Sequence, residues 1–315
     1  MDDEQRQHRS RKARIAWAIA ALSLFVTIPT IAAPSPTISA EPHEIIWAVN
    51  NAPPFHIFKG EYQHQGICDT LVSAFEEALP QYRHRKELMP HPRISALMMA
   101  DRNYCFPCVI HKANTEYALH SEPTHIYPTH GIITRAELAQ QWQQAFAAAG
   151  SDRVRLAAVL AQREFRLGQP VARRYGDLQP LIEDYQLQTD LHVNVSGDDN
   201  NVALMSMIAS GRLDFTIDYQ AMLRYYQLND DGADSNLVFV PLQETAQTQI
   251  IGSVACSATD WGRESIAILN QAIPAIRTNQ NFLNSLRTWL GGDDPQAYLD
   301  ELEQTLGGTT AEPND

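Results

Sequence analysis

The sequence predicts an α/β fold, and the stretch from residue 45 to residue 79 carries most of that prediction. Ile45 to Val49 is a short, nearly continuous apolar run, typical of a strand covered on both faces of a parallel sheet. Two prolines end this strand, and from Ile67 to Leu79 the apolar residues recur at helical spacing. Asp69 or Thr70 is expected to cap the start of the helix, and a proline ends it.

Ligands of open α/β sheets lie beyond the carboxyl ends of the strands, so residues 50–55 are expected at the mouth of a ligand site. The alternative is an ordinary strand-loop-helix unit that binds no ligand. The rest of the chain alternates between strand and helix patterns in the same way. Further strands are expected at 105–110, 124–134, 154–160, 191–195, 214–218, 237–242 and 249–256. Further helices are expected at 92–98, 137–149, 178–185, 201–210, 263–273, 279–290 and 295–306.

Residues 1–33 have the pattern of a secretory signal peptide: a basic start, an apolar run, then small residues. A retained membrane anchor is the alternative, because residues 15–33 are just long enough to span a bilayer. No later segment reaches the roughly 20 apolar residues that a spanning helix needs. The mature protein is therefore expected to begin near Ala33 or Pro34 and to be exported to the periplasm.

The charge balance excludes one class of partner. The chain of 315 residues has a net charge of −13, and without residues 1–33 it keeps 19 basic and 34 acidic residues, a net charge of −15. Backbone phosphates require a basic face, so no nucleic-acid partner is expected. The acidic excess favours solubility, and the remaining length of about 280 residues fits two lobes of ordinary domain size.

The four cysteines, Cys68, Cys105, Cys108 and Cys256, are an even number in an exported chain, where disulfides persist. Cys105 and Cys108 have the C-x-x-C spacing of a redox motif, but they lie in an expected strand and not at a helix start that would stabilise a thiolate. Structural bridges are therefore expected. Residues three apart in an extended strand lie roughly 10 Å apart, so a local bridge would need Pro107 to turn the chain.

Five short patterns in a fixed order resemble family 3 extracellular solute-binding proteins. They are I-x-W-x-x-x-x-x-P-P-F ending at Phe55 with G-I-x-D at 66–69, a helix with Leu97 before the strand 105–110, Ser121-Glu122-Pro123, Gly211-Arg212-Leu213-Asp214, and Ile250 to Ala255. The resemblance implies the two-lobed periplasmic binding protein type II fold, with two hinge strands and a ligand held between two α/β lobes.

The resemblance also implies the domain boundaries. They are a signal peptide at 1–33, the first part of lobe one at 34–126, a hinge strand at 127–135, lobe two at 136–248, a second hinge strand at 249–256, the C-terminal part of lobe one at 257–306 and a disordered tail at 307–315.

Seven residues are expected to contact the ligand: Asn50, Asn51, Phe55, Tyr175, Gly176, Asp218 and Tyr219. Phe55 is expected to stack on it, because the family places an aromatic residue there and an exposed ring gives contact area at a low entropy cost. The alternative is that Phe55 belongs to the core. In the family, the loop and helix start near Tyr175 and Gly176 hold the ligand's carboxylate through unpaired backbone N–H groups.

Amino-acid-binding members clamp the ligand's carboxylate with an arginine that this sequence lacks, since none lies between Ile110 and Ser121. At the position of the family's amine-binding aspartate stands Tyr219, directly after Asp218. Adjacent side chains in a strand face opposite ways, so Asp218 would substitute only if the register shifted. A small polar or aromatic ligand other than a free α-amino acid is therefore expected.

The resemblance places Cys105, Cys108 and Cys256 in lobe one, and it implies a disulfide from Cys256 to one of the other two. No metal or cofactor is expected. The evenly spaced His120, His125 and His130 would put neighbours on neither one helix face nor one strand face, and no metal motif occurs.

The predicted function is that of an exported, monomeric binding protein that presents a small-molecule ligand to a membrane transporter or a sensor. Two other classes remain open. A periplasmic dehydratase-like enzyme on the same fold would need Glu116 or Asp218 as its general acid. A protein that binds a partner but no small-molecule ligand would keep its two lobes in the open state. No catalytic residue is predicted, since no hydrolase, P-loop or dinucleotide motif is present.

Overall fold

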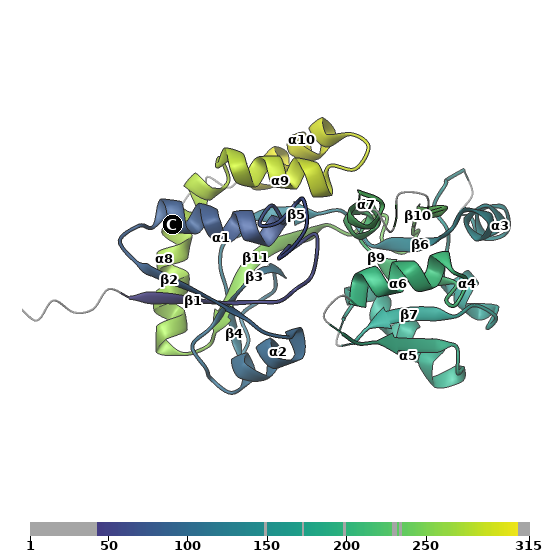
Figure 1. Cartoon of the computed structure of the whole chain (residues 1–315), viewed down its shortest axis with the longest axis horizontal. Helices are drawn as coiled ribbons and strands as arrows, with labels where there is room; N and C mark the ends of the chain where they lie inside the picture. Colours follow the sequence, from purple (N-terminus) through teal and green to yellow (C-terminus); the bar gives the residue numbers. More distant parts are fainter. Residues whose placement is uncertain are drawn as a thin grey trace, which may run out of the picture. The chain divides into compact units, whose positions relative to one another are not determined.

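The computed structural model describes residues 43–147, 150–171, 173–197, 200–228, 232 and 235–307. The expected signal peptide, residues 1–33, lies outside the described residues. Residues 308–315 of the expected tail also lie outside them. The described chain forms two sheets with helices packed against them (Figure 1).

The first sheet belongs to lobe one and has the strand order β2-β1-β3-β11-β4, with β5 also paired to β11. β1 pairs in parallel with β2 and β3, whereas β11 runs antiparallel to its neighbours. Its strands are β1 (Glu44–Val49), β2 (Arg83–Leu88), β3 (Cys105–Ile110), β4 (Ala118–His120), β5 (His125–Tyr127) and β11 (Ile250–Ser257). Its helices are α1 (Ile67–Ala78), α2 (His91–Met99), α8 (Asp260–Ile276), α9 (Gln280–Leu290) and α10 (Pro295–Leu306).

Both faces of β1 are buried, as its apolar run predicts. Ile45 and Trp47 join the core that contains the buried side of α1, while Ala48 joins a second core with Ile94 of α2. Successive residues of a strand face opposite ways, so a strand between two helical layers must be apolar at almost every position.

The second sheet belongs to lobe two and has the order β10-β6-β9-β7-β8, with β7 parallel to both β8 and β9. Its strands are β6 (Gly131–Arg135), β7 (Leu167–Pro170), β8 (His192–Val195), β9 (Phe215–Asp218) and β10 (Leu237–Pro241). Its helices are α3 (Ala136–Phe146), α4 (Leu156–Ala161), α5 (Gln179–Gln188) after a 3₁₀ turn at Gly176–Leu178, α6 (Asn200–Ala209) and α7 (Gln220–Leu228).

The chain passes between the two sheets twice. It leaves sheet one after β5 and enters sheet two at β6, with only residues 128–130 between them. It returns from β10 to β11 through residues 242–249. Lobe one is thus built from both ends of the described chain, and lobe two from its middle.

The expected strand at 154–160 is wrong, because Leu156–Ala161 is the helix α4. Leu156, Val159 and Leu160 are buried and stand at helical i, i+3 and i+4 spacing, and alanines fill the remaining places. The strand of this region is β7, which the sequence analysis did not predict. Gly168 in β7 lets the sheet approach α6, because the side chains of Leu204 and Leu213 occupy the space that a Cβ would take.

The N-cap of α1 is neither Asp69 nor Thr70, although Asp69 does help to cap the helix from its first turn. The helix begins at Ile67 with Gly66 as its N-cap, and Asp69 in the first turn accepts a hydrogen bond from the Gly66 backbone N–H (3.2 Å). Three further elements, β2, β4 and α7, were not predicted. The charged sequence of β2 suits its place at the sheet edge, where burial gives no apolar signal, and α7 follows β9 without a loop signal.

Candidate functional site

A cleft of about 650 Å³ lies where the two lobes face each other. Its walls come from the residues at or just after the carboxyl ends of β1, β2, β7 and β8, and from the starts of α2 and α6, which is where open α/β sheets hold ligands. The lining residues from lobe one are Asn50, Asn51, Ala52, Phe58, Leu88, Met89, Pro90, His91 and Pro92. Those from lobe two are Pro170, Val171, Arg173, Ser196, Gly197, Asn200 and Asn201.

Arg173 is the one Asp, Glu, Lys or Arg among the described residues that line the cleft. Its Nη2 donates to Oδ1 of Asp218 at 2.5 Å, and the side chain of Asp218 is 1 % exposed. Burial raises the pKa of Asp218 while the guanidinium opposes that shift, and the carboxylate in turn raises the pKa of Arg173 against its own desolvation. The positive guanidinium of Arg173 therefore borders the cleft, and the carboxylate of Asp218 that neutralises it is buried behind the guanidinium.

Lobe two fixes the position of Arg173 from several sides. Its backbone carbonyl accepts a hydrogen bond from Nε2 of Gln169 (2.7 Å), whose Oε1 contacts the His192 ring at 2.7 Å. The guanidinium carbon lies 5.5 Å from the ring centre of Tyr219 and 5.9 Å from that of Tyr175. Such contacts are attractive because the ring faces carry partial negative charge.

A cluster of rings connects the lobes beside this ion pair. Tyr219 of lobe two stacks with His130 (4.1 Å between ring centres) and with Tyr127 (5.3 Å). Phe55 of lobe one meets both Tyr127 and Tyr219 edge-on at 6.0 Å. Burial raises the pKa of Tyr127, Tyr175 and Tyr219 and lowers that of His130 to about 3, so these side chains are neutral at pH 7.

The structure pairs Cys105 with Cys256 and Cys68 with Cys108. Cys105 and Cys256 stand opposite each other in the antiparallel pair β3 and β11, which brings their side chains together. The first of these bridges is one of the two pairings that the resemblance implied. Cys108 has φ +58° and lies where the pairing of β3 with β11 shifts register, so the strand is locally irregular there before it continues to Ile110.

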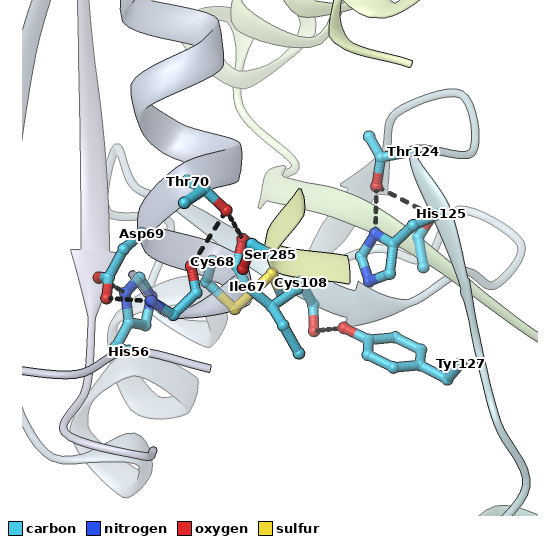
Figure 2. Close-up of a disulfide and its surroundings, with 12 residues drawn as sticks. His56, Ile67, Cys68, Asp69, Thr70, Cys108, Thr124, His125, Tyr127 and Ser285 are labelled. Atoms are coloured by element: carbon cyan, nitrogen blue, oxygen red, sulfur yellow. Dashed lines mark hydrogen bonds and ion pairs between the residues drawn. A yellow bond between two sulfur atoms is a disulfide. The ribbon is translucent and has the colours of Figure 1, made fainter. Parts of the chain in front are cut away.

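The Cys68–Cys108 bridge lies near Tyr127, a member of the ring cluster, as Figure 2 shows. The Tyr127 hydroxyl donates to the carbonyl oxygen of Cys108 at 2.7 Å, and the Cys68 backbone N–H donates to that of Phe55 at 2.8 Å. Close by, Asp69 contacts Nδ1 of His56 at 2.7 Å. The disulfide thus joins the start of α1 to β3, and the hydrogen bond from Tyr127 connects β3 to the end of β5, where the first passage between the lobes begins.

The seven expected ligand residues divide into two groups. Asn50 and Asn51 line the cleft, directly after β1. The other five are not among the described residues that line it: Phe55 and Tyr219 pack in the ring cluster, Tyr175 is buried beside it, Gly176 starts the 3₁₀ turn, and Asp218 lies behind Arg173. Asp218 stands at the end of β9, opposite Gly131 of β6.

Sequence reasoning missed most of the cleft. Phe58, three residues beyond Phe55, supplies the aromatic lining, and Arg173 supplies the charge. Arg173 stands in the loop that the resemblance matched with carboxylate binding, and that position was the available signal. His91 and Leu88 border a strand that was not predicted, so nothing in the sequence indicated them.

The described residues contain no group of three or more His, Cys, Asp or Glu side chains arranged to hold a metal ion. Within the same residues, no helix combines the length and apolar character needed to cross a membrane.

No protein-family model matches this sequence, and no curated protein matches it significantly. Solved structures do match it. A histidine kinase sensor domain similar to periplasmic binding proteins has a TM-score of 0.56 and 14 % identity, over 80 % of this chain and 97 % of that one. An arginine-specific periplasmic binding protein of Salmonella typhimurium has a TM-score of 0.55 and 10 % identity, over 80 % and 100 %. The periplasmic VFT2 domain of Bordetella pertussis BvgS has a TM-score of 0.52 and 18 % identity, over 78 % and 93 %.

These likenesses concern the fold, since every identity is low. The chain has the two-lobed periplasmic binding protein type II fold, as the sequence predicted. The proteins that share this fold with it here are solute-binding proteins and sensor domains.

Proposed function

We propose that this chain is an exported solute-binding protein whose two lobes close on a small ligand and present it to a membrane transporter or a sensor. The observation that carries the proposal is the cleft of about 650 Å³, to which both lobes contribute polar and apolar walls. That volume lies within the roughly 300 to 1,000 Å³ of small-molecule sites. A ligand that touches both lobes binds the closed state better than the open one and so shifts the population toward it.

The two passages between the sheets are the proposed hinges. Residues 128–130 and 242–249 join the lobes, so a rotation about them opens or closes the cleft. Phe55 and Tyr219 enter the proposal as a ring contact at 6.0 Å between the lobes, which closure would keep or remake. The domain boundaries given by the resemblance belong to the same proposal.

Export supports this function. Two disulfides suit an oxidising compartment, and the leader pattern of residues 1–33 supplies a route there. The solved structures of similar fold include parts of both amino-acid ABC transporters and sensor kinases, so the proposal names both kinds of partner. The enzymatic alternative gains nothing from the geometry: Glu116 is exposed and Asp218 is paired with Arg173.

A thermal-shift screen with amino acids, polyamines, opines and aromatic acids tests the binding function. A solute that binds only the folded state raises the melting temperature by mass action. Small-angle scattering with each hit should then show a smaller radius of gyration. Product analysis after incubation separates binding from turnover.

A pair of alanine variants locates the site. Replacing Phe58, which lines the cleft, should weaken binding of a hit by about 1 to 3 kcal/mol. Replacing the exposed Leu187 of α5, which is not among the described residues lining the cleft, should leave the affinity unchanged. The proposal is wrong if no solute produces both a thermal shift and compaction, or if both variants bind a hit as the wild type does.

A further inference from the structure

The charge that faces the cleft is positive, although the protein as a whole is acidic. The side chain of Arg173 is 23 % exposed, whereas that of its partner Asp218 is 1 % exposed. The hydrogen bond to Asp218 uses Nη2, and a guanidinium has five N–H donors in a fork that matches a carboxylate or a phosphate. An anion can therefore meet Arg173 without displacing Asp218.

The field of Arg173 extends across the cleft into lobe one. His91, at the start of α2, has its pKa lowered first by burial and then by the positive charge of Arg173. The imidazole packs against Phe106 of β3 at 5.5 Å, and Arg173 is the charged group that acts on it. The cleft between Arg173 and His91 is thus bordered by a positive charge in lobe two and by a neutral imidazole in lobe one.

The rest of the wall is largely apolar and comes from both lobes. Leu88 is 61 % exposed at the end of β2, and Val171 is 42 % exposed just after β7. Phe58 and three prolines, Pro90, Pro92 and Pro170, line the same cleft. Exposed apolar side chains that face one cavity from two lobes indicate a surface that a ligand covers.

We propose that the cleft selects a small organic anion with an apolar body, and that Arg173 is the residue that selects its charge. This inference deepens the proposed function and rests on it. The anionic group lies against the free side of the Arg173 guanidinium, and the apolar body lies between Leu88 and Phe58 of lobe one and Val171 of lobe two. The amides of Asn50 and Asn201 border the same space and offer further N–H donors.

The same geometry disfavours an ammonium group on the ligand. No carboxylate occurs among the described residues that line the cleft, and Asp218, which lies behind Arg173, is already paired with it. A cation placed there would be repelled by Arg173 and would find no counter-ion on the described walls. The two aspartates that follow Gly197 in the sequence lie outside the described residues and are tested below.

The test compares probes of one shape and different charge on the whole mature protein. The probes are benzoate and phenyl phosphate as anions, benzamide as the neutral isostere and benzylamine as the cation, with hexanoate, hexanamide and hexylamine as an aliphatic set. Calorimetry at up to about 10 mM detects affinities down to the millimolar range. Each anion should bind at least tenfold more tightly than its neutral isostere, and the amines should bind most weakly.

Variants separate charge selection from a structural role. R173Q alone would leave a buried carboxylate unpaired, so the decisive variant is R173Q/D218N, which removes both charges together. It should fold and lose the preference for anions. D218N alone keeps the guanidinium, and the amide oxygen still accepts its hydrogen bond, so anions should bind at least as tightly as in the wild type. Thermal unfolding checks that every variant is folded.

The outcomes are distinct. A folded R173Q/D218N that keeps the wild-type preference, a neutral or cationic probe that binds as tightly as the matched anion, or no binding of any anion overturns the inference. A D198N/D199N variant should show the same rank order of probes as the wild type, and a reversed order also counts against it. If the broad solute screen yields compaction only with neutral or cationic hits, the binding function stands and the anion preference falls.

Discussion

The two lobes share an α/β architecture, but different interactions stabilise the inside of each lobe. In lobe one, two disulfides join α1 to the end of β3 and β3 to β11. In the described part of lobe two, ion pairs of largely buried aspartates join segments distant in sequence: Asp214 contacts Arg135 (3.1 Å) and Arg166 (3.0 Å), and Asp218 pairs with Arg173. Lobe one should therefore respond to reduction, and lobe two to changes of charge.

This difference bears on the site. Lobe one contributes the Asn50 loop and Phe58 from a framework tied covalently across segments distant in sequence. Lobe two contributes Arg173, whose position depends on a carboxylate and on neighbouring rings. In a binding protein that closes on its ligand, a charged wall held by noncovalent contacts would thus approach a wall held by disulfides.

The largest effect should come from the covalent ties. The Cys105–Cys256 bridge closes a separation of 151 residues, and Cys68–Cys108 closes one of 40. In the chain-entropy model, replacing each pair with alanines should cost about 5 and about 4 kcal/mol respectively. Peptide-resolved hydrogen exchange should locate the loss in lobe one. Equal loss of protection in both lobes would show that the lobes unfold as one unit.

Acid should weaken the region of the first passage between the lobes. Burial lowers the pKa of His125 to about 3, and burial together with Arg173 lowers that of His130 to about 3. In the unfolded chain both would titrate near 6.5, so between pH 6.5 and 3 the unfolded state binds more protons. Stability is therefore full above pH 6.5 and falls below it, by up to about 1.4 kcal/mol per pH unit for each histidine.

Urea unfolding at pH 7 and pH 5 measures this slope. The variant H130Q should flatten it, since glutamine does not titrate, and the exposed His64 replaced by glutamine serves as a control that should not. A protein that is equally stable at both pH values would contradict the buried, neutral state of the two rings.

Asp214 tests the ionic ties of lobe two. Asp214 also accepts the Arg166 backbone N–H at 2.7 Å, and these contacts lower its pKa against the cost of burial. D214N should cost about 2 to 3 kcal/mol, below the roughly 3 to 5 of a fully buried pair because Arg166 is half-exposed. E183Q, which breaks the exposed pair of Glu183 with Arg174, should cost less than about 0.5 kcal/mol. Similar losses in both variants would mean that burial does not distinguish these pairs.

The smallest expected effect is a change in the pKa of His91 in lobe one when the charge of Arg173 in lobe two is removed. In R173Q/D218N the His91 pKa should rise but stay below 6.5, because the charge of Arg173 is gone and the burial of the ring remains. An NMR titration of His91 measures the shift. An unchanged pKa would show that the charge of lobe two does not reach lobe one.

The sequence by itself determined the α/β class and the two-lobed fold, because both depend on local patterns. The apolar run of β1 and the helical stripe of α1 are set by residues near one another in the chain, and short motifs in order marked the fold. The same local reasoning failed at two elements: the short apolar run of α4 also suits a buried strand, although its Leu and Ala residues favour a helix, and the charged β2 gains its place from the strand that it pairs with.

Only the tertiary structure decided the candidate site. Asn50 and Asn51 could be placed from the sequence because they directly follow a recognisable strand. Arg173, His91 and Phe58 meet only because strands from two sheets end at one cleft, and no local pattern records that meeting. The same holds for the pairing of Asp218 with Arg173, 45 residues away: sequence gives the two charges, but folding decides which of them is buried and which faces the ligand.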